Sequence, residues 1–182
     1  MVGDIMEIKA KSKFDFETSK ALAHVSVYKK NNPKKTTTAR FIVCFVLLLA
    51  IICEYIAFDI DNSFLLLILV VVFVTLFDVF GYFILPKIQY KSLLKMQDTE
   101  NEYIFYDKFI KEFTKSTDYT AEANIEYSLF VKVYETSKYF FLFQTKNQVF
   151  VIDKSTIMGG TAEEIKNKLM PVVKNNYIVC KY

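Results

Sequence analysis

Two long apolar segments in the middle of the chain restrict its fold more than any other feature of the sequence. Residues 41–58 read FIVCFVLLLAIICEYIAF, residues 64–85 read FLLLILVVVFVTLFDVFGYFIL, and the polar residues 59–63, DIDNS, separate them. A helix that crosses the hydrocarbon core of a bilayer needs about 20 mostly apolar residues, with a range of about 17–25. Because backbone groups in hydrocarbon must bond to one another, the segments are predicted to form a transmembrane helical hairpin rather than the buried hairpin of a soluble protein.

The charges around the two spans predict their orientation. Residues 41–86 contain no Lys or Arg, whereas basic residues cluster just before the first span and just after the second. Basic residues concentrate on the cytoplasmic side of membrane proteins, so both termini are expected in the cytoplasm and the loop outside. The same side chains suit contact with anionic lipid headgroups; the alternative is that they set the topology alone. They are Lys29, Lys30, Lys34, Lys35 and Arg40 before the first span and Lys87, Lys91 and Lys95 after the second.

One acid lies deep within the second span. Asp78 is seven residues from the inner end of that segment, which corresponds to a depth of about 10 Å. Charged residues at such depths usually face a partner or a cavity, so a contact with a helix of a second copy or of another subunit is one interpretation. The other is a snorkelling or protonated Asp near the cytoplasmic side, which Arg40 could assist. Gly81 would allow close helix approach on the same face, but no second small residue completes a dimerisation motif.

The polar arm formed by residues 1–40 contains two predicted elements. Apolar and charged residues alternate between Met6 and Phe16, which is the pattern of a strand. A short amphipathic helix is expected over residues 18–30, with Thr18 or Ser19 as its cap and with His24 exposed. An isolated strand leaves its backbone groups unpaired, so the strand is expected to dock on the sheet of the C-terminal half, with Ile8 directed to one side of that sheet.

The C-terminal half changes from helical to strand-like character. Pro86 is expected to end or kink the second span, and residues 86–102 are expected to form a basic amphipathic helix and a polar linker. Within residues 103–182, six short runs rich in aromatic and β-branched residues predict an antiparallel meander that closes into a small barrel or sandwich. Thr161 and Glu164 have the spacing of a capping box, and Pro171 is expected to limit the following helix to little more than two turns. The runs are residues 103–106, 109–115, 119–124, 127–135, 138–145 and 148–153.

The order of these parts resembles a known family. VYET at residues 133–136, YFFLF at residues 139–143 and IDK at residues 152–154 are similar to segments of the YcxB-like family of small bacterial membrane proteins. The resemblance implies a C-terminal domain like that of bacterial pleckstrin-homology (PH) domains. The expected fold class is therefore membrane α+β: a two-helix transmembrane hairpin plus a small antiparallel β-meander, PH-like and cytoplasmic, closed by a C-terminal helix.

The residues for common catalytic and cofactor sites are missing from the sequence. His24 is the only histidine, and no two of the three cysteines have CxxC spacing. No HExxH, GxxxxGK[ST] or GxGxxG motif occurs. Residues 87–182 carry fourteen basic and twelve acidic residues, which is too balanced for a nucleic-acid surface. We therefore expect a non-enzymatic protein without a cofactor, a metal site or a nucleic-acid partner.

Three functions remain open at this level. The first is a membrane-anchored module of the bacterial cytoplasmic membrane, whose cytoplasmic domain binds a protein or lipid headgroups. The second is an immunity protein against a membrane-active peptide or bacteriocin. The third is an accessory subunit of a transporter or membrane enzyme, for which Asp78 is the only support. The expected partners are membrane lipids and either an unidentified protein or a second copy of the chain.

Overall fold

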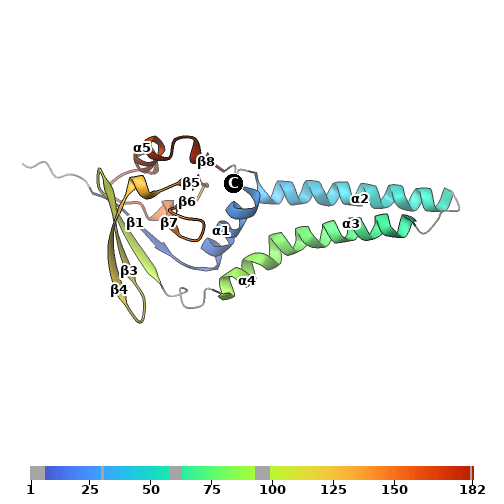
Figure 1. The fold of residues 1–182 in the computed structure, drawn as a ribbon, viewed down its shortest axis with the longest axis horizontal. Helices are drawn as coiled ribbons and strands as arrows, with labels where there is room; N and C mark the ends of the chain where they lie inside the picture. Colours follow the sequence, from blue (N-terminus) through green and yellow to red (C-terminus); the bar gives the residue numbers. More distant parts are fainter. Residues whose placement is uncertain (1–6, 30, 58–62, 93–98, 181) are drawn as a thin grey trace, which may run out of the picture.

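The protein consists of a β domain and a helical hairpin that projects from it (Figure 1). The computed structural model describes residues 7–29, 31–57, 63–92, 99–180 and 182, with the backbone alone for residues 54–57 and 63–67. The predicted polar loop between the spans lies almost entirely outside the described residues, as do Lys30 and Lys95.

The hairpin is built from two helices that are long and apolar enough to cross a membrane. Helix α2 (Pro33–Ala57) runs outward, and α3 (Ser63–Val79) returns beside it (Figure 1). A seam of apolar side chains joins the helices, with Cys44, Ile51 and Val71 buried in it. The outer faces are apolar but open, and Phe73 is 70% exposed. An apolar surface of this kind requires lipid or protein around it.

The first helix begins before the apolar segment. Asn32 accepts a hydrogen bond from the Lys35 backbone N–H at 3.1 Å, and Pro33 opens the helix, where its missing N–H costs nothing. Lys34, Lys35 and Arg40 thus lie in the first turns of α2 itself. Their charges are held at the base of the hairpin, on one continuous helix.

The second helix does not end at Pro86. It passes from α3 through the π-helical segment η1 (Phe80–Ile84) into α4 (Leu85–Ser92), and it changes direction there (Figure 1). Pro86 has no N–H for the carbonyl of Tyr82 four residues earlier, and the helix widens just before the proline. Residues 93–98, the end of the predicted basic helix and the start of its linker, lie outside the described residues.

The first sheet joins the predicted N-terminal strand to the first three strands of the predicted meander. Its strands are β1 (Ile8–Lys13), β2 (Glu100–Phe105), β3 (Phe109–Lys115) and β4 (Thr120–Glu126), all antiparallel in the order β1-β2-β3-β4. Strand β1 pairs with β2 over six residues, from Ile8 opposite Phe105 to Lys13 opposite Glu100. The prediction that the N-terminal strand docks on this sheet is confirmed, and Ile8 and Ala10 face the core.

The second sheet has the order β7-β6-β5-β8 and a parallel pair that the sequence did not predict. Strands β5 (Lys132–Glu135), β6 (Tyr139–Phe143) and β7 (Val149–Asp153) form a meander, and β8 (Tyr177–Val179) adds to β5 in parallel. The predicted strand over residues 127–135 was wrong in its first half. Residues Tyr127–Leu129 form the 3-10 turn η3, whose Tyr127 hydroxyl donates to the Tyr106 carbonyl at 2.8 Å.

The two sheets enclose the main core, and α5 (Ala162–Val173) covers it. Phe140 and Leu142 of β6 point into this core and are fully buried, as are Ile165 and Leu169 of α5. The capping box of Thr161 and Glu164 is confirmed. The prediction that Pro171 limits the helix to little more than two turns was wrong, since α5 continues past it to Val173. The proline removes only one backbone donor, and the helix tolerates this loss near its end.

The Gly159–Gly160 turn allows β1 to lie against the rest of the domain. Gly159 has φ of 72°, and a Cβ there would collide with the backbone carbonyl of Glu7. A Cβ at Gly160 would meet the side chain of Ile8. Lys9 and Met158 exchange backbone hydrogen bonds of 2.8 Å beside this turn. The two glycines are therefore needed because the N-terminal strand passes over them.

Candidate functional site

Helix α1 (Phe16–Tyr28) joins the β domain to the hairpin and is the centre of the candidate site. Asp15, not Thr18 or Ser19, caps it by accepting from the Thr18 N–H at 2.8 Å. The side of α1 that carries Val25 packs on the second sheet, against Phe141 among others. This explains why every residue from Tyr139 to Leu142 is buried: β6 has the main core on one face and α1 on the other.

The opposite side of α1 contacts the base of the hairpin. Phe16 meets Tyr90 of α4 edge to face, with ring centroids 5.6 Å apart. The Tyr28 hydroxyl lies 3.2 Å from the Thr37 hydroxyl of α2. Helix α1 thus lies between the β domain and the hairpin, as Figure 1 also shows, and it fixes the position of one relative to the other.

His24 is buried at this joint, so the prediction that it is exposed was wrong. Its Nε2 lies 3.4 Å from the Tyr82 carbonyl oxygen, and the two rings stack with centroids 4.9 Å apart. Because a carbonyl can only accept, the histidine ring must donate from Nε2. The proline four residues after Tyr82 supplies no N–H, and His24 lies where that donor is missing. The helical periodicity of the arm could not reveal a partner 58 residues away.

Burial lowers the pKa of His24 below its ordinary value, and the hydrogen bond to the Tyr82 carbonyl opposes this shift. Lys20 adds to the lowering and Glu17 opposes it. Protonation of the ring would place a charge in a contact that is almost closed to water, so the joint favours the neutral imidazole.

The C-terminus also reaches this joint. The Tyr182 hydroxyl donates to the Lys29 carbonyl at 3.0 Å, and the Tyr182 carbonyl accepts from the Ser137 N–H at 2.9 Å. Lys29 has φ of 53° and ends α1 just before the chain turns into α2. The last residue of the chain therefore holds the turn that leads into the hairpin.

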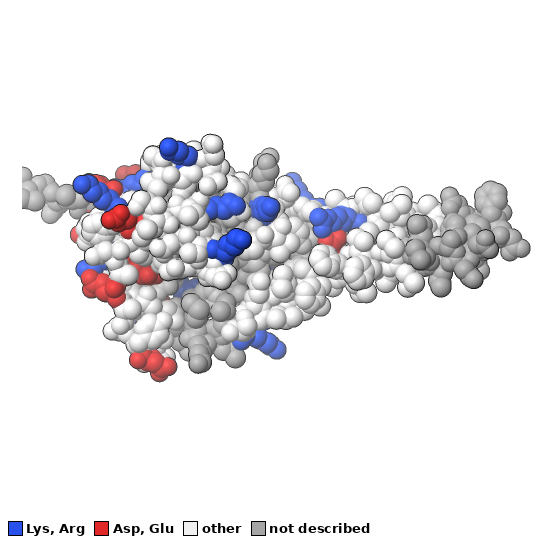
Figure 2. Space-filling view, in the orientation of Figure 1, with Lys and Arg blue, Asp and Glu red and all other residues white. Residues whose placement is uncertain are grey.

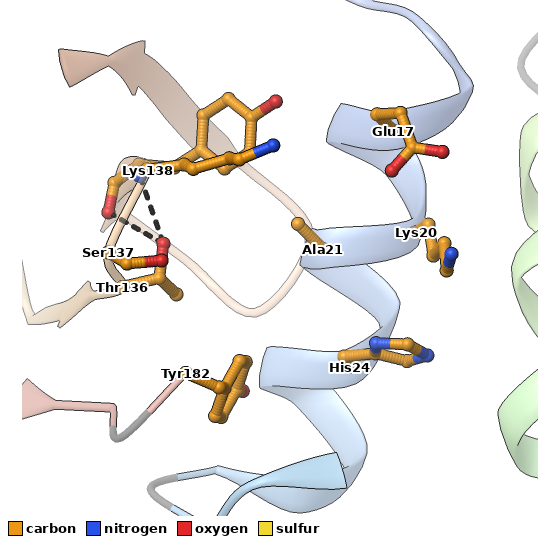
Figure 3. Close-up of a pocket in the computed structure, with 9 residues that line it drawn as sticks. Glu17, Lys20, Ala21, His24, Thr136, Ser137, Lys138 and Tyr182 are labelled. Carbon is orange, nitrogen blue, oxygen red and sulfur yellow. Dashed lines mark hydrogen bonds between the residues drawn. The ribbon is translucent and has the colours of Figure 1, made fainter. Parts of the chain in front are cut away.

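A small cavity lies between α1 and the turn that joins β5 to β6 (Figure 3). Its volume is about 140 Å³, and Glu17, Lys20 and Lys138 are among the charged residues that line it. Figure 3 shows Ala21 pointing toward the turn and the His24 ring pointing away from it. Thr136 closes the turn through two hydrogen bonds with Tyr139. A cavity of this size with charges of both signs can hold water or a small polar molecule.

A larger groove runs along the other end of α1. Its volume is about 420 Å³, and it lies between Ser26 of α1, the start of β5 and the β6–β7 turn. Its charged residues are Lys132 and Lys146, and its apolar surface includes Val131, which is 55% exposed. No pattern in the sequence indicates this groove, because its residues come from four separate segments.

The two predicted intramembrane residues, Asp78 and Gly81, have different surroundings: one is buried in an ion pair and the other faces open space. Asp78 is 4% exposed, and its carboxylate lies 2.6 Å from Arg40 of the same chain. The carboxylate of Asp78 thus has a charge partner within the same chain. Figure 2 shows basic and acidic atoms next to each other on the part of the hairpin nearest the β domain. Gly81 has nothing within 4 Å of its Cβ position, so among the described residues no other helix packs against it.

Apart from Arg40, the predicted basic residues that the structure describes lie on the surface around the base of the hairpin. They do not converge on a single point, and no carboxylate among the described residues forms an ion pair with them. The exposed ones are Lys29, Lys34, Lys35, Lys87 and Lys91.

A half-buried charge cluster crosses the second sheet, and both of its charged residues, Glu135 and Lys154, belong to the segments that carry the family resemblance. Lys154 donates to a Glu135 carboxylate oxygen and to the Thr136 carbonyl, both at 2.7 Å. The Tyr177 hydroxyl donates to the other Glu135 oxygen at 2.8 Å. The same ammonium group lies 4.5 Å from the centre of the Phe140 ring. This cluster ties β5 to the end of β7 and to β8, which is a structural role.

Among the described residues, no group of three or more His, Cys, Asp or Glu side chains could hold a metal ion. The three cysteines are free; Cys44 and Cys180 are buried, and Cys53 is exposed.

The comparisons identify the class of domain. Residues 111–169, from β3 into α5, match the family model described as YcxB-like protein. The YcxB-like assignment of the chain is thereby confirmed over this segment. No curated protein and no solved structure matches the chain.

Proposed function

We propose that this chain is a membrane-anchored, non-enzymatic protein of the bacterial cytoplasmic membrane that presents a PH-like domain for binding lipid headgroups or a protein. The hairpin is the anchor, and both termini lie in the cytoplasm. The packing of α1 is the observation that carries this proposal. Because α1 contacts the second sheet on one side and the hairpin base on the other, it holds the β domain in a fixed orientation to the hairpin and so to the membrane surface.

The strand arrangement supports the PH-like part of the proposal. The first sheet has four antiparallel strands, β5 to β7 form a second antiparallel meander, and α5 follows them. This is the outline of a PH domain whose first two strands are separated by a membrane hairpin. The short β8 is an addition to that outline.

Charge placement supports the topology and favours lipid among the ligands. The exposed lysines of the described residues 29–40 and 87–91 lie where the chain enters and leaves the hairpin, and a cytoplasmic leaflet carries anionic lipid. The accessory-subunit alternative loses its only support, because Arg40 already neutralises Asp78 within the chain. No residue specifies the immunity alternative.

The test is extraction of the full chain from membranes with mild detergent, followed by analysis of the proteins and lipids that copurify. We expect the chain to stay with membranes through an alkaline wash and to retain anionic phospholipid or a defined protein. A strictly monomeric chain with neither a partner nor a lipid preference would contradict the proposal.

A further inference from the structure

We propose that the groove between α1 and the β5–β6–β7 strands is a binding site for the headgroup of an anionic phospholipid of the membrane in which the chain is anchored. The inference deepens the proposed function and rests on it, because it names the ligand class and the residues.

Charge is the first argument. Lys132 and Lys146 line the groove from two different segments, and no Asp or Glu lines it. Neither lysine forms an ion pair among the described residues, whereas Lys154 and Lys168 of the same domain do. Two ammonium groups without carboxylate partners at one hollow surface attract a phosphate-bearing ligand.

The apolar lining is the second argument. Val131 is more than half exposed, and the rings of Tyr134 and Phe143 lie edge to face beside it, with centroids 5.7 Å apart. The Lys132 ammonium group lies over the Tyr134 ring, 5.1 Å from its centre, so a positive charge and an aromatic face meet in the groove lining. Charge beside exposed apolar surface matches the boundary between headgroups and acyl chains.

Position is the third argument. Ser26, on the groove wall, lies in the last turn of α1, and the chain enters the hairpin helix α2 seven residues later at Pro33. Lys29, Lys34 and Lys35 follow Ser26 on the exposed surface. The groove is therefore on the side of the domain where the chain enters the membrane, next to a basic segment that faces the same lipid.

The experiment uses the full chain in neutral detergent with a fluorescent reporter in the groove. The sequence contains no Trp, so Val131→Trp introduces a single one at an exposed position. Short-chain phosphatidylglycerol and short-chain phosphatidylcholine are titrated separately, and the tryptophan emission gives an apparent dissociation constant for each. We expect phosphatidylglycerol to bind more tightly.

The variants then test the two lysines. Lys132→Gln with Lys146→Gln should weaken phosphatidylglycerol binding about tenfold, since each lysine near an anionic surface contributes a severalfold effect. Lys132→Arg with Lys146→Arg should retain it. The matched control is Lys108→Gln with Lys115→Gln, which removes the same charge from two exposed lysines, one in the β2–β3 turn and one at the end of β3. Neither lysine forms an ion pair among the described residues, so this control should leave binding unchanged.

Equal binding of the two lipids, or an unchanged constant in the double Gln variant, would overturn the site. Displacement of phosphatidylglycerol by a polyglutamate peptide at a lower concentration than the lipid itself would overturn the lipid as occupant. None of these three results bears on whether the chain stays with membranes through the alkaline wash or copurifies with a protein, so failure of this site is distinguishable from failure of the proposed function.

Discussion

Replacing Lys154 by Met tests whether the charge cluster of the second sheet stabilises the domain. The change removes two hydrogen bonds of 2.7 Å and the contact with the Phe140 ring, while the similar volume keeps the packing. Glu135 would remain with its side chain 14% exposed and with the Tyr177 hydroxyl as its donor.

The magnitude follows from this geometry. Removal of one partner of a buried ion pair costs about 3–5 kcal/mol, because the other charge is left without compensation. Glu135 keeps one donor and both side chains are partly exposed, so the loss of unfolding free energy for Lys154→Met should lie near the lower end of this range, at about 3 kcal/mol. For a chain of this size that corresponds to a fall of about 6–12 °C in the unfolding midpoint.

The assay is thermal unfolding of the full chain in detergent, followed by near-ultraviolet circular dichroism of its packed tyrosines. Glu135→Gln added to Lys154→Met should recover part of the loss, since no uncompensated charge is then buried. The matched control is Lys166→Met, which removes a lysine paired with the exposed Glu163 and should hardly move the midpoint. Equal shifts for the two lysine variants would refute the reasoning.

Changes at four other sites test further contacts by thermal unfolding. Gly159→Ala adds a side chain at φ of 72° that collides with the backbone before β1, so we expect a loss of about 1–3 kcal/mol. Gly81→Ala, whose added methyl group meets nothing within 4 Å, should not lower the midpoint. In lipid nanodiscs, Arg40→Gln should lower the unfolding midpoint more than Asp78→Asn does. The double variant should have a higher midpoint than Arg40→Gln alone, and the reverse order would contradict a charge pair. Because burial lowers the pKa of His24, the unfolded chain binds more protons than the folded chain as pH falls through about 6.5, so stability should drop from neutral pH toward about pH 5. His24→Phe should flatten that drop, and an unchanged profile would remove His24 as its source.

The length of the apolar segments and the periodicity of apolar residues were sufficient to predict most of the local elements. The apolar segments predicted two helices, the alternation over residues 6–16 predicted β1, and the Thr161 and Glu164 spacing predicted the start of α5. The unpaired backbone of an isolated strand was sufficient to predict that β1 joins the sheet of the C-terminal half. These features depend on neighbours in the chain or on a general rule of hydrogen bonding, so they do not require coordinates.

The tertiary structure decided the contacts between distant segments. The periodicity of α1 gave it a single apolar face, yet both of its sides are covered, because the second sheet lies on one and the hairpin base on the other. His24 is buried since a proline 62 residues later leaves a helix carbonyl without its donor. The partner of Asp78, the parallel strand β8 and the lysine groove likewise depend on which segments the fold places side by side. Such pairings leave no periodic trace in the sequence, because each partner satisfies only its own local pattern.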